Sequence, residues 1–286
     1  MTEPADREKN APVRRSAIPG NAGGGRVAIV TGAGRGLGRA MALALARSGV
    51  RVLATASRER TEVESAAEEA GRDCIVPMLA DVTREAHAQR VVETALERFG
   101  RLDILVNNAG RGMKYVSERF MTEPTRFWEV EPAVWRMVID TNINGPFLMA
   151  RAATPHLIRA GWGRIINISM NHSTMRRAGF SPYGPSKAAL ESETVIWAQD
   201  LRGTGVTVNA LLPGGATLTG MIPPAAPQAV RERLLDPALM GPPLLWLVSR
   251  AADTFTGRRL NASRWDAADP HAAIEEAGWT REAAGG

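Results

Sequence analysis

The chain has 286 residues, 44% of them hydrophobic, which suits one large α/β domain with a substantial core. Its 35 basic and 30 acidic residues give a net charge of +5, but they interleave rather than form the basic stripe of a nucleic-acid site. No apolar run approaches the roughly 18 residues of a membrane span, the start lacks the apolar core of a secretory signal, and Cys74 is the only cysteine. We therefore expect a cytoplasmic protein with no nucleic acid or membrane partner.

The first part of the chain alternates between short apolar runs and helical patterns. Residues 1–25 are polar and end in three glycines, which predicts a disordered N-terminal tail. Strands are then expected at 26–31, 51–55, 74–79 and 102–106, and helices at 37–48, 58–70 and 84–99. Because these strands are apolar throughout and alternate with helices, they predict a parallel sheet covered on both faces.

The second part continues this alternation after an interruption. Residues 111–130 hold methionines and aromatics without clear periodicity, and they predict either a lid-like insertion or ordinary core. Helices are expected at 133–160 (with a bend near Gly145-Pro146), 182–201 and 242–249, and strands at 164–168, 206–211 and 258–262. Residues 213–228, rich in Pro, Gly and Thr, predict a mobile substrate or cofactor loop. Residues 266–286 are expected to form a C-terminal tail.

A glycine-rich turn, TGAGRGLG at residues 31–38, joins the first predicted strand to the first predicted helix. Glycines in such a turn let the backbone approach a pyrophosphate closely, and the helix N-terminus attracts the negative charge. In this strand–turn–helix context the turn predicts a dinucleotide-binding site.

Tyr183 and Lys187 are four residues apart, so they share one face of the helix predicted at 182–201. Pro182 and Pro185 fit only the first turn of a helix, which places Tyr183 at the entrance, facing a cleft. A nearby ammonium lowers the pKa of a phenol, so Tyr183 is expected to act as an acid or base closer to neutral pH. Alone, the spacing also occurs on ordinary surface helices.

Three patterns together resemble one known family. The glycine-rich turn has the spacing T-G-x-x-x-G-x-G, the segment Asn107-Asn108-Ala109-Gly110 follows the fourth predicted strand, and the Tyr183 and Lys187 pair comes later. In this order they resemble the short-chain dehydrogenase/reductase family over roughly residues 26–262. The resemblance implies a single Rossmann-type domain at 26–265, a three-layer α/β sandwich with a parallel sheet of about seven strands.

The resemblance also implies roles for individual residues. Tyr183 would transfer a proton to or from the substrate oxygen, Lys187 would also hold the nicotinamide ribose, and Asn142 would support a water-linked proton path to Lys187. Around the phosphates, adenine, ribose and carboxamide, the implied coenzyme contacts are Gly32, Arg35, Gly36, Leu37, Asp81, Val82, Asn108, Ala109, Pro213, Gly214, Thr217 and Thr219. For Asn108 and Asn142 the alternatives are a simple turn and a helix kink. The four histidines are widely spaced, and no metal is expected.

The charges expected near the end of the second predicted strand indicate which coenzyme is preferred. An NAD site usually presents an acidic residue at the end of the second strand. Here that position is Ala56, followed by Ser57 and Arg58, with Arg35 in the glycine-rich turn. These residues offer donors and positive charge to a 2′-phosphate, and no carboxylate is expected nearby to repel it. We expect NADP(H) to be preferred, with NAD(H) possible.

One position departs from the family pattern. The family's serine, which donates to the substrate oxygen, normally lies thirteen residues before the tyrosine, and here that residue is Met170. Ser169 is one residue early and would point to the opposite face of a strand. Either Ser169, Asn171 or Ser173 replaces the donor, or catalysis is slow or absent. Ser169 is our candidate catalytic residue beside Tyr183, Lys187 and Asn142.

The sequence therefore predicts an NAD(P)-dependent oxidoreductase that interconverts a secondary alcohol and a ketone. The alternative is a nucleotide-binding protein of the same fold with little or no turnover, a regulatory or partner subunit, because of Met170. If the segment 111–130 forms a lid over the cleft, its apolar residues favour a fairly apolar substrate, and Arg111, Lys114, Arg176 and Arg177 leave room for an acidic group at the edge of the pocket. The resemblance also implies a homodimer or homotetramer built on the long helices.

Overall fold

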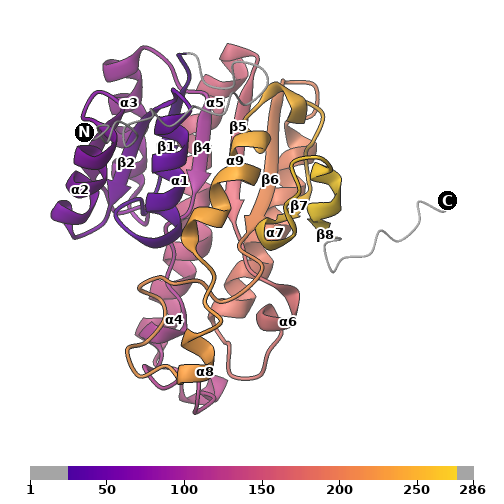
Figure 1. Ribbon diagram of the computed structural model, residues 1–286. Helices are drawn as coiled ribbons and strands as arrows, with labels where there is room; N and C mark the ends of the chain where they lie inside the picture. The colour runs from indigo at the N-terminus through magenta and orange to yellow at the C-terminus, as the bar shows by residue number, and fades with distance from the viewer. Residues whose placement is uncertain (1–24, 276–286) are drawn as a thin grey trace, which may run out of the picture.

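The computed structural model describes residues 25–275, and the strands and helices of this part form layers around one sheet (Figure 1). Apart from Gly25, the predicted tail at 1–25 lies outside the described residues, as do residues 276–286.

The sheet has eight strands in the order β3-β2-β1-β4-β5-β6-β7-β8. The first seven are parallel, and β8 pairs with β7 in the antiparallel sense. This confirms the prediction of a parallel sheet of about seven strands. The strands are β1 Val27–Val30, β2 Arg51–Ala56, β3 Ile75–Leu79, β4 Ile104–Asn107, β5 Gly163–Ile168, β6 Val206–Leu212, β7 Arg259–Asn261 and β8 Ile274–Glu275.

The longer helices cover both faces of the sheet. Helices α1 (Gly36–Arg47), α2 (Arg60–Ala70) and α9 (Gly241–Leu247) pack on one face. Helices α3 (Glu85–Phe99), α5 (Gly145–Ala160) and α7 (Tyr183–Asp200) pack on the other. Helices α4 (Pro132–Ile139), α6 (His172–Met175) and α8 (Gln228–Arg231) lie in a lobe that projects beyond one end of the sheet (Figure 1).

Short turns of other helix types connect these elements. The 3₁₀ helices are η1 Met113–Tyr115, η2 Phe127–Glu129, η4 Pro237–Met240, η5 Arg250–Ala252, η6 Ala262–Arg264 and η7 Pro270–Ala273. The π-helical segment η3, Asp140–Asn144, joins α4 to α5. The long helix expected at 133–160 is therefore interrupted just before Gly145-Pro146, where the sequence predicted a bend.

Strand β1 shows how the sequence produces the layers. All four of its side chains are fully buried, Val27 and Ile29 on the α3 side and Ala28 and Val30 on the α1 side. Alternate residues of a strand face opposite sides, so a strand covered on both faces must be apolar throughout. The chain order reverses beside β1, between β2 and β4. In open α/β sheets ligands bind outside the carboxyl ends of the strands at such a point.

The sheet continues past the domain boundary that we predicted at residue 265. Beyond it lie η7 and strand β8, whose Ile274 and Glu275 pair with Leu260 and Arg259 of β7. The sequence of this segment is polar and rich in alanine, so it carries no strand pattern of its own. Its place is set by contacts with β7.

Candidate active site

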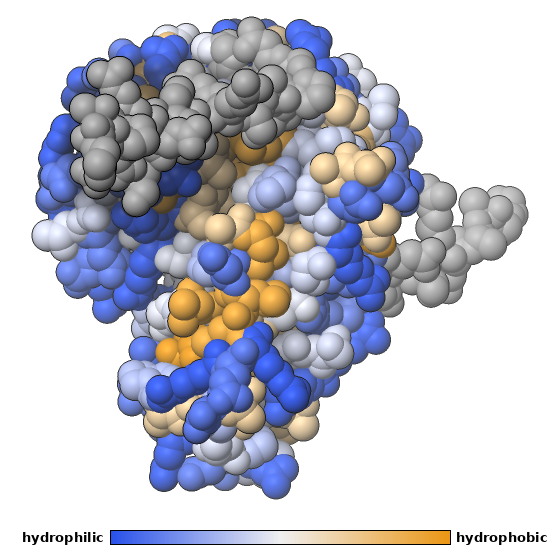
Figure 2. All heavy atoms as spheres, viewed as in Figure 1, coloured by the Kyte–Doolittle hydropathy of each residue, from blue (hydrophilic) through white to orange (hydrophobic). Residues whose placement is uncertain are grey.

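A cavity of about 810 Å³ opens at the carboxyl ends of the central strands. It is lined by the glycine-rich turn, by residues after β2, β3, β4 and β5, by the start of α7 and by the loop after β6. Figure 2 shows hydrophobic side chains gathered where the lobe meets the body of the molecule. The cavity thus has a polar coenzyme side near β1 and a more apolar side towards the lobe.

The glycine-rich turn is packed so closely that its backbone has no room for a side chain at Gly38. A Cβ atom there would lie 2.2 Å from the Gly32 carbonyl oxygen and 2.3 Å from Asn108 Nδ2. Asn108 Nδ2 donates hydrogen bonds to the carbonyl oxygens of Thr31 (2.8 Å) and Gly32 (3.0 Å). Asn108 therefore ties the end of β4 to the turn after β1 and fixes the shape of the turn.

The N-terminus of α1 is free to bind an anion. No side chain caps this helix end, and its first turn contains no acidic residue. The loop after β6 folds over the turn, because a Cβ on Gly36 would lie 3.0 Å from Thr219 Cγ2. Free backbone N–H groups at a helix N-terminus attract phosphate. The residues present therefore fit the pyrophosphate of a dinucleotide.

The ribose end of the cavity carries both signs of charge. Ser57 and Arg58 line it as predicted, but so do Glu59 and Glu62, and Arg35 Nη1 lies 3.3 Å from Glu62 Oε1. Our expectation that no carboxylate lies nearby is wrong, because α2 starts soon after β2 and its first turn faces the glycine-rich turn. Glu62 thus forms an ion pair with Arg35, the arginine that we expected to bind a 2′-phosphate.

Tyr183 and Lys187 meet at the floor of the cavity. Lys187 Nζ donates to the Ile168 carbonyl oxygen (2.7 Å) and lies 6.0 Å from the centre of the Tyr183 ring. Burial lowers the pKa of Lys187 to about 8, and the negative charge of Glu191 acts in the opposite direction. Burial raises the pKa of Tyr183 to about 12. The expected lowering of the Tyr183 pKa is therefore wrong for this structure, since desolvation disfavours the phenolate.

Asn142 lies in the π-helical segment η3, next to Lys187 but behind the cavity wall. Its side chain accepts a hydrogen bond from Arg111 N (2.7 Å) and donates to Arg111 O (2.9 Å) and Ser186 Oγ (2.9 Å). A Cβ on Gly110 would lie 3.3 Å from Asn142 Oδ1 and 3.8 Å from Lys187 Nζ. Asn142 thus joins the loop after β4 to α7, and its role in a proton path stays a prediction.

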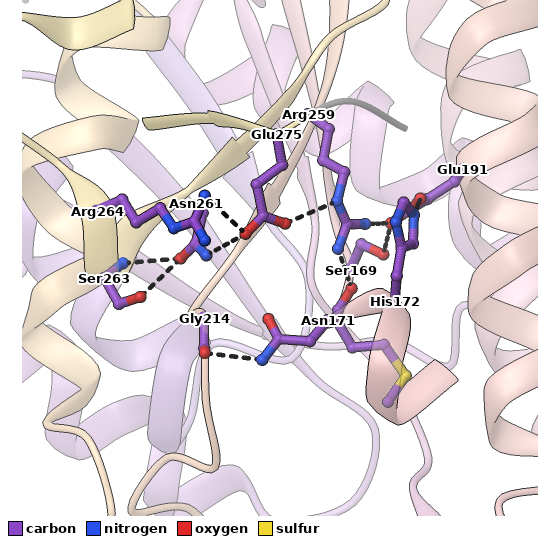
Figure 3. Close-up of polar contacts among 11 residues, drawn as sticks. Ser169, Asn171, His172, Glu191, Gly214, Arg259, Asn261, Ser263, Arg264 and Glu275 are labelled. Atoms are coloured by element: carbon purple, nitrogen blue, oxygen red, sulfur yellow. Dashed lines mark hydrogen bonds and ion pairs between the residues drawn. The ribbon is translucent and has the colours of Figure 1, made fainter. Parts of the chain in front are cut away.

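The hydroxyl group of Ser169 is engaged in a buried polar network (Figure 3). It donates to the carboxylate of Glu191, which is also paired with Arg259. His172 Nε2 lies 3.1 Å from the other oxygen of this carboxylate. Ser169, Glu191 and Arg259 are each at most 4% exposed. Whether Ser169 serves in catalysis stays a prediction, but its hydroxyl already has a partner in this structure.

Arg259 extends the network to the C-terminal strand (Figure 3). Its Nη2 donates to the Met170 carbonyl oxygen (2.6 Å), and its Nε lies 3.2 Å from Glu275 Oε2. Asn261 Nδ2 donates to the other oxygen of Glu275 (2.6 Å). A buried guanidinium needs such a full set of partners. Strand β8 therefore helps to hold the end of β5 that forms the cavity wall.

The substrate side of the cavity is apolar and rich in methionine. Met113, Met170, Met175 and Phe180 form a buried cluster against which Tyr183 packs. The 111–130 segment contributes to this wall through Met113 and Phe120, whose ring meets Phe180 edge-on at 5.8 Å. In the same segment Phe127 and Trp128 are 67% exposed. The segment is thus partly wall and partly surface, and its function as a lid stays a prediction.

The structure brings most predicted site residues together. The predicted catalytic and coenzyme-binding residues all line the cavity except Asn142, which lies behind its wall, and Gly214, which lines a smaller polar pocket. Asn171 Nδ2 donates to the Gly214 carbonyl oxygen (2.7 Å). Lining residues that the sequence did not indicate include Glu62 and Thr174. Neither belongs to a motif, so their only signal is a position shortly after the end of a strand.

The part of the chain between residues 25 and 275 contains no helix that is both long and apolar enough to cross a membrane. It also contains no group of three or more His, Cys, Asp or Glu residues that could hold a metal ion.

Comparisons with known proteins agree with the geometry of the cavity. A family model described as short chain dehydrogenase matches residues 26–229. The short chain dehydrogenase mpl6 of Monascus purpureus is 32% identical over 260 residues, 88% of this chain and 85% of that protein. The 3-oxoacyl-(acyl-carrier-protein) reductase of Synechocystis sp. is 35% identical over 191 residues, 66% of this chain and 73% of that protein. The solved structure of 3-ketoacyl-(acyl-carrier-protein) reductase from Brucella melitensis, complexed with NADH, has a TM-score of 0.73 and 31% identity, and the match covers 83% of this chain and 96% of that chain.

Proposed function

Since the chain belongs to the short-chain dehydrogenase/reductase family, we propose that it interconverts a secondary alcohol and a ketone, with Tyr183 as proton donor or acceptor. The nicotinamide coenzyme supplies or accepts the hydride when bound. The observation that carries the proposal is that Tyr183 and Lys187 meet in a cavity beside a turn fitted to a dinucleotide.

The two residues divide the acid–base work. With a pKa of about 12, the Tyr183 phenol keeps its proton at neutral pH and can donate it to a substrate oxygen that gains negative charge. With a pKa of about 8, Lys187 is mostly charged at neutral pH. Its ammonium stabilises the phenolate that remains after proton transfer. At neutral pH the site therefore holds the proton that reduction of a ketone consumes.

We propose that NADP(H) is the preferred coenzyme and that NAD(H) can also bind. Arg58 and Ser57 line the ribose end and offer positive charge and a hydroxyl donor to a 2′-phosphate. Arg35 joins them once it leaves Glu62. The carboxylates of Glu59 and Glu62 act against the phosphate and limit the preference. The similar structure complexed with NADH supports the view that the non-phosphorylated coenzyme also fits this fold.

We propose an apolar ketone with an acidic group at one end as the substrate class. The apolar wall of Met113, Met170 and Phe180 would bind the hydrophobic part. Arg111, Lys114 and Arg177 also line the cavity and would bind the acidic part, whereas Arg176 does not line it. A 3-oxo ester such as ethyl 3-oxohexanoate, compared with the free 3-oxo acid, tests both ideas. A lower KM for the acid at equal kcat would support the acidic group.

The direct test uses the two tyrosines of the chain, both of which line the cavity. Tyr183→Phe should lower kcat for ketone reduction by roughly 10²- to 10⁴-fold, because it removes the proton donor. Its affinity for the reduced coenzyme should stay close to that of the wild type. Tyr115→Phe is the matched control and should retain turnover. Equal losses in both variants would overturn the role of Tyr183.

A nucleotide-binding protein without useful turnover is the second candidate. It is favoured by Met170, which has no donor to offer, and by the engagement of Ser169 with Glu191. It predicts that the folded protein binds the reduced coenzyme but does not oxidise it with any ketone of a broad panel. Turnover with one ketone, lost in Tyr183→Phe, would exclude it.

We also propose that copies of the chain associate through the outer surfaces of α4, α5 and α7. Trp135, Phe147 and Ile196 are 39%, 45% and 51% exposed on these helices, which is unfavourable for a surface facing water. Light scattering should give the mass of a dimer or tetramer. The double variant Phe147→Glu with Ile196→Glu should shift the mass towards the monomer, and an unchanged mass would contradict this interface.

A further inference from the structure

The end of β5 offers no free hydroxyl to a substrate. Met170 occupies the position where the family pattern has a serine, and its side chain lies in the apolar cluster with Tyr183. The neighbouring hydroxyl of Ser169 donates to Glu191, which Arg259 holds in place. Ser169 would have to leave a buried carboxylate in order to serve a substrate, and this is costly in a low-dielectric interior.

The two other candidates from the sequence are also engaged or point elsewhere. Asn171 donates one of its two amide N–H groups to the Gly214 carbonyl oxygen at 2.7 Å, which holds the amide against the loop after β6, and its carbonyl oxygen cannot donate. Ser173 is exposed and lines a separate polar pocket with His172 rather than the cavity of Tyr183. Ser173 therefore cannot donate into the Tyr183 cavity, and Asn171, which lines it, has one amide N–H left to donate.

Thr174 combines a place in the Tyr183 cavity with a hydroxyl that makes no hydrogen bond to another described residue. It lines the same cavity as Tyr183, and its hydroxyl has no hydrogen-bond partner in the part of the chain between residues 25 and 275. By contrast, the hydroxyls of Thr141 and Thr217, which also line the cavity, donate to the carbonyl oxygens of Met137 (2.8 Å) and Gly215 (3.2 Å). Between Ser169 and Arg177, Thr174 is the residue that both lines this cavity and has a hydroxyl without a hydrogen bond among the residues that the structure describes.

Close packing places Thr174 near the catalytic tyrosine. Its helix α6 presses against the first turn of α7, because a Cβ on Gly184 would lie 2.1 Å from the Met175 carbonyl oxygen. Thr174 precedes Met175, and Gly184 follows Tyr183 in the sequence. Because residue 184 is glycine, α6 can approach the start of α7 more closely than it could if residue 184 had a side chain.

We propose that the Thr174 hydroxyl donates a hydrogen bond to the substrate oxygen beside Tyr183, in the place of the serine that Met170 replaces. This inference rests on the proposed reductase function. As negative charge develops on the substrate oxygen, the hydroxyl and the phenol hold it from two sides, and the proton still comes from Tyr183. Thr174 is then a catalytic residue that sequence comparison by position does not find.

The test measures reduction of ethyl 3-oxohexanoate with NADPH. Thr174→Val removes the hydroxyl and keeps the shape, and it should lower kcat by about 10²- to 10³-fold with little change in coenzyme affinity. Thr174→Ser keeps a hydroxyl and should retain most of the turnover. Ser173→Ala is the matched control and should behave like the wild type. A Thr174→Val variant with kcat within about twofold of an active wild type would overturn the proposal.

A double variant separates a catalytic role from a structural one. Met170→Ser restores a donor at the family position, so it should have little effect in the wild type but should recover turnover in the Thr174→Val background. A loss in Thr174→Val that Met170→Ser does not recover would overturn the catalytic role. A wild type that binds NADPH but reduces no ketone would overturn the reductase function itself, and with it this inference. These two failures are distinguished by the wild-type measurement alone.

Discussion

The coenzyme side and the substrate side of the cavity are built in different ways. The coenzyme side is made largely of backbone, with Gly32, Gly38 and Asn108 fixed to one another by contacts that leave no space. The substrate side is made of side chains from short helices and loops, chiefly Met113, Met170 and Phe180. The first surface suits one ligand that does not vary, whereas flexible methionine side chains suit a surface adapted to a particular substrate.

This difference explains why one side follows the family pattern and the other departs from it. A pyrophosphate on backbone N–H groups needs glycines at fixed spacings, and any other residue blocks the turn. A hydroxyl that donates to a substrate oxygen can come from any segment that reaches the oxygen. Replacement of the family serine by Met170 is therefore tolerable if α6 brings another hydroxyl to the same place.

Alanine at Gly38 should break the coenzyme side with the largest effect. Its Cβ would lie 2.2 Å from the Gly32 carbonyl oxygen, so the turn must open. We expect NADPH binding to weaken by about 100-fold or more, which corresponds to about 2.7 kcal/mol. Fluorescence titration measures this. Gly241→Ala, where the new methyl meets only Ala44 Cβ at 3.2 Å, is the control. Unchanged affinity in Gly38→Ala would contradict the placement of the pyrophosphate.

Alanine at Gly184 should instead break the substrate side. The new methyl collides with the Met175 carbonyl oxygen and moves α6 away from α7. We expect kcat/KM for the ketone to fall by roughly 10- to 100-fold, since misplacement of reacting groups by about 1 Å has effects of this size. NADPH affinity should change little. Loss of coenzyme binding in this variant would show that the two sides are not independent.

The pH dependence of kcat tests the role of Lys187, which lies between the coenzyme side and the substrate side of the cavity. Lys187 is charged below its pKa of about 8 and loses its charge as the pH rises through this value. Because the charge stabilises the phenolate of Tyr183, kcat for ketone reduction at saturating NADPH should fall as the pH rises through about 8. A kcat that stays constant from about pH 7 to about pH 10 would contradict this role of Lys187.

The smallest expected effect concerns Glu62 at the ribose end. Glu62→Gln removes the carboxylate that holds Arg35, so the ratio of NADPH to NADH affinity should rise by about three- to fivefold, the size typical of an exposed ion pair. Glu64→Gln is the matched control, because Glu64 is paired with Arg60 on the same helix and its side chain is equally exposed, at 33%. An equal ratio in both variants would contradict the competition for Arg35.

The sequence predicts the parts of the molecule that depend on local patterns. The buried strand β1 and the glycine-rich turn are examples, because alternating burial and close backbone contacts act over a few residues. The pairing of Glu62 with Arg35 joins residues 27 positions apart and follows only from the direction of α2. Strand β8 has no pattern of its own, and Arg259 and the pairing with β7 hold it in place.

The pKa of Tyr183 and the substrate donor show the same limit. The spacing of Tyr183 and Lys187 indicates the pair, but the burial that raises the pKa of the phenol depends on how the 111–130 segment and α6 pack around it. The engagement of Ser169 by Glu191 joins β5 to α7 and could not be derived from either segment alone. What distinguishes Thr174 as a donor is the set of hydrogen bonds made by its neighbours, which the sequence does not give.

The most direct test of the account is titration of the purified protein with NADPH and with NADH, following nicotinamide fluorescence and quenching of the seven tryptophans. We predict that both reduced coenzymes bind at the glycine-rich turn and that NADPH binds more tightly, with binding lost in Gly38→Ala. Failure of the folded wild type to bind either coenzyme would contradict the central claim that this cavity is a nicotinamide coenzyme site.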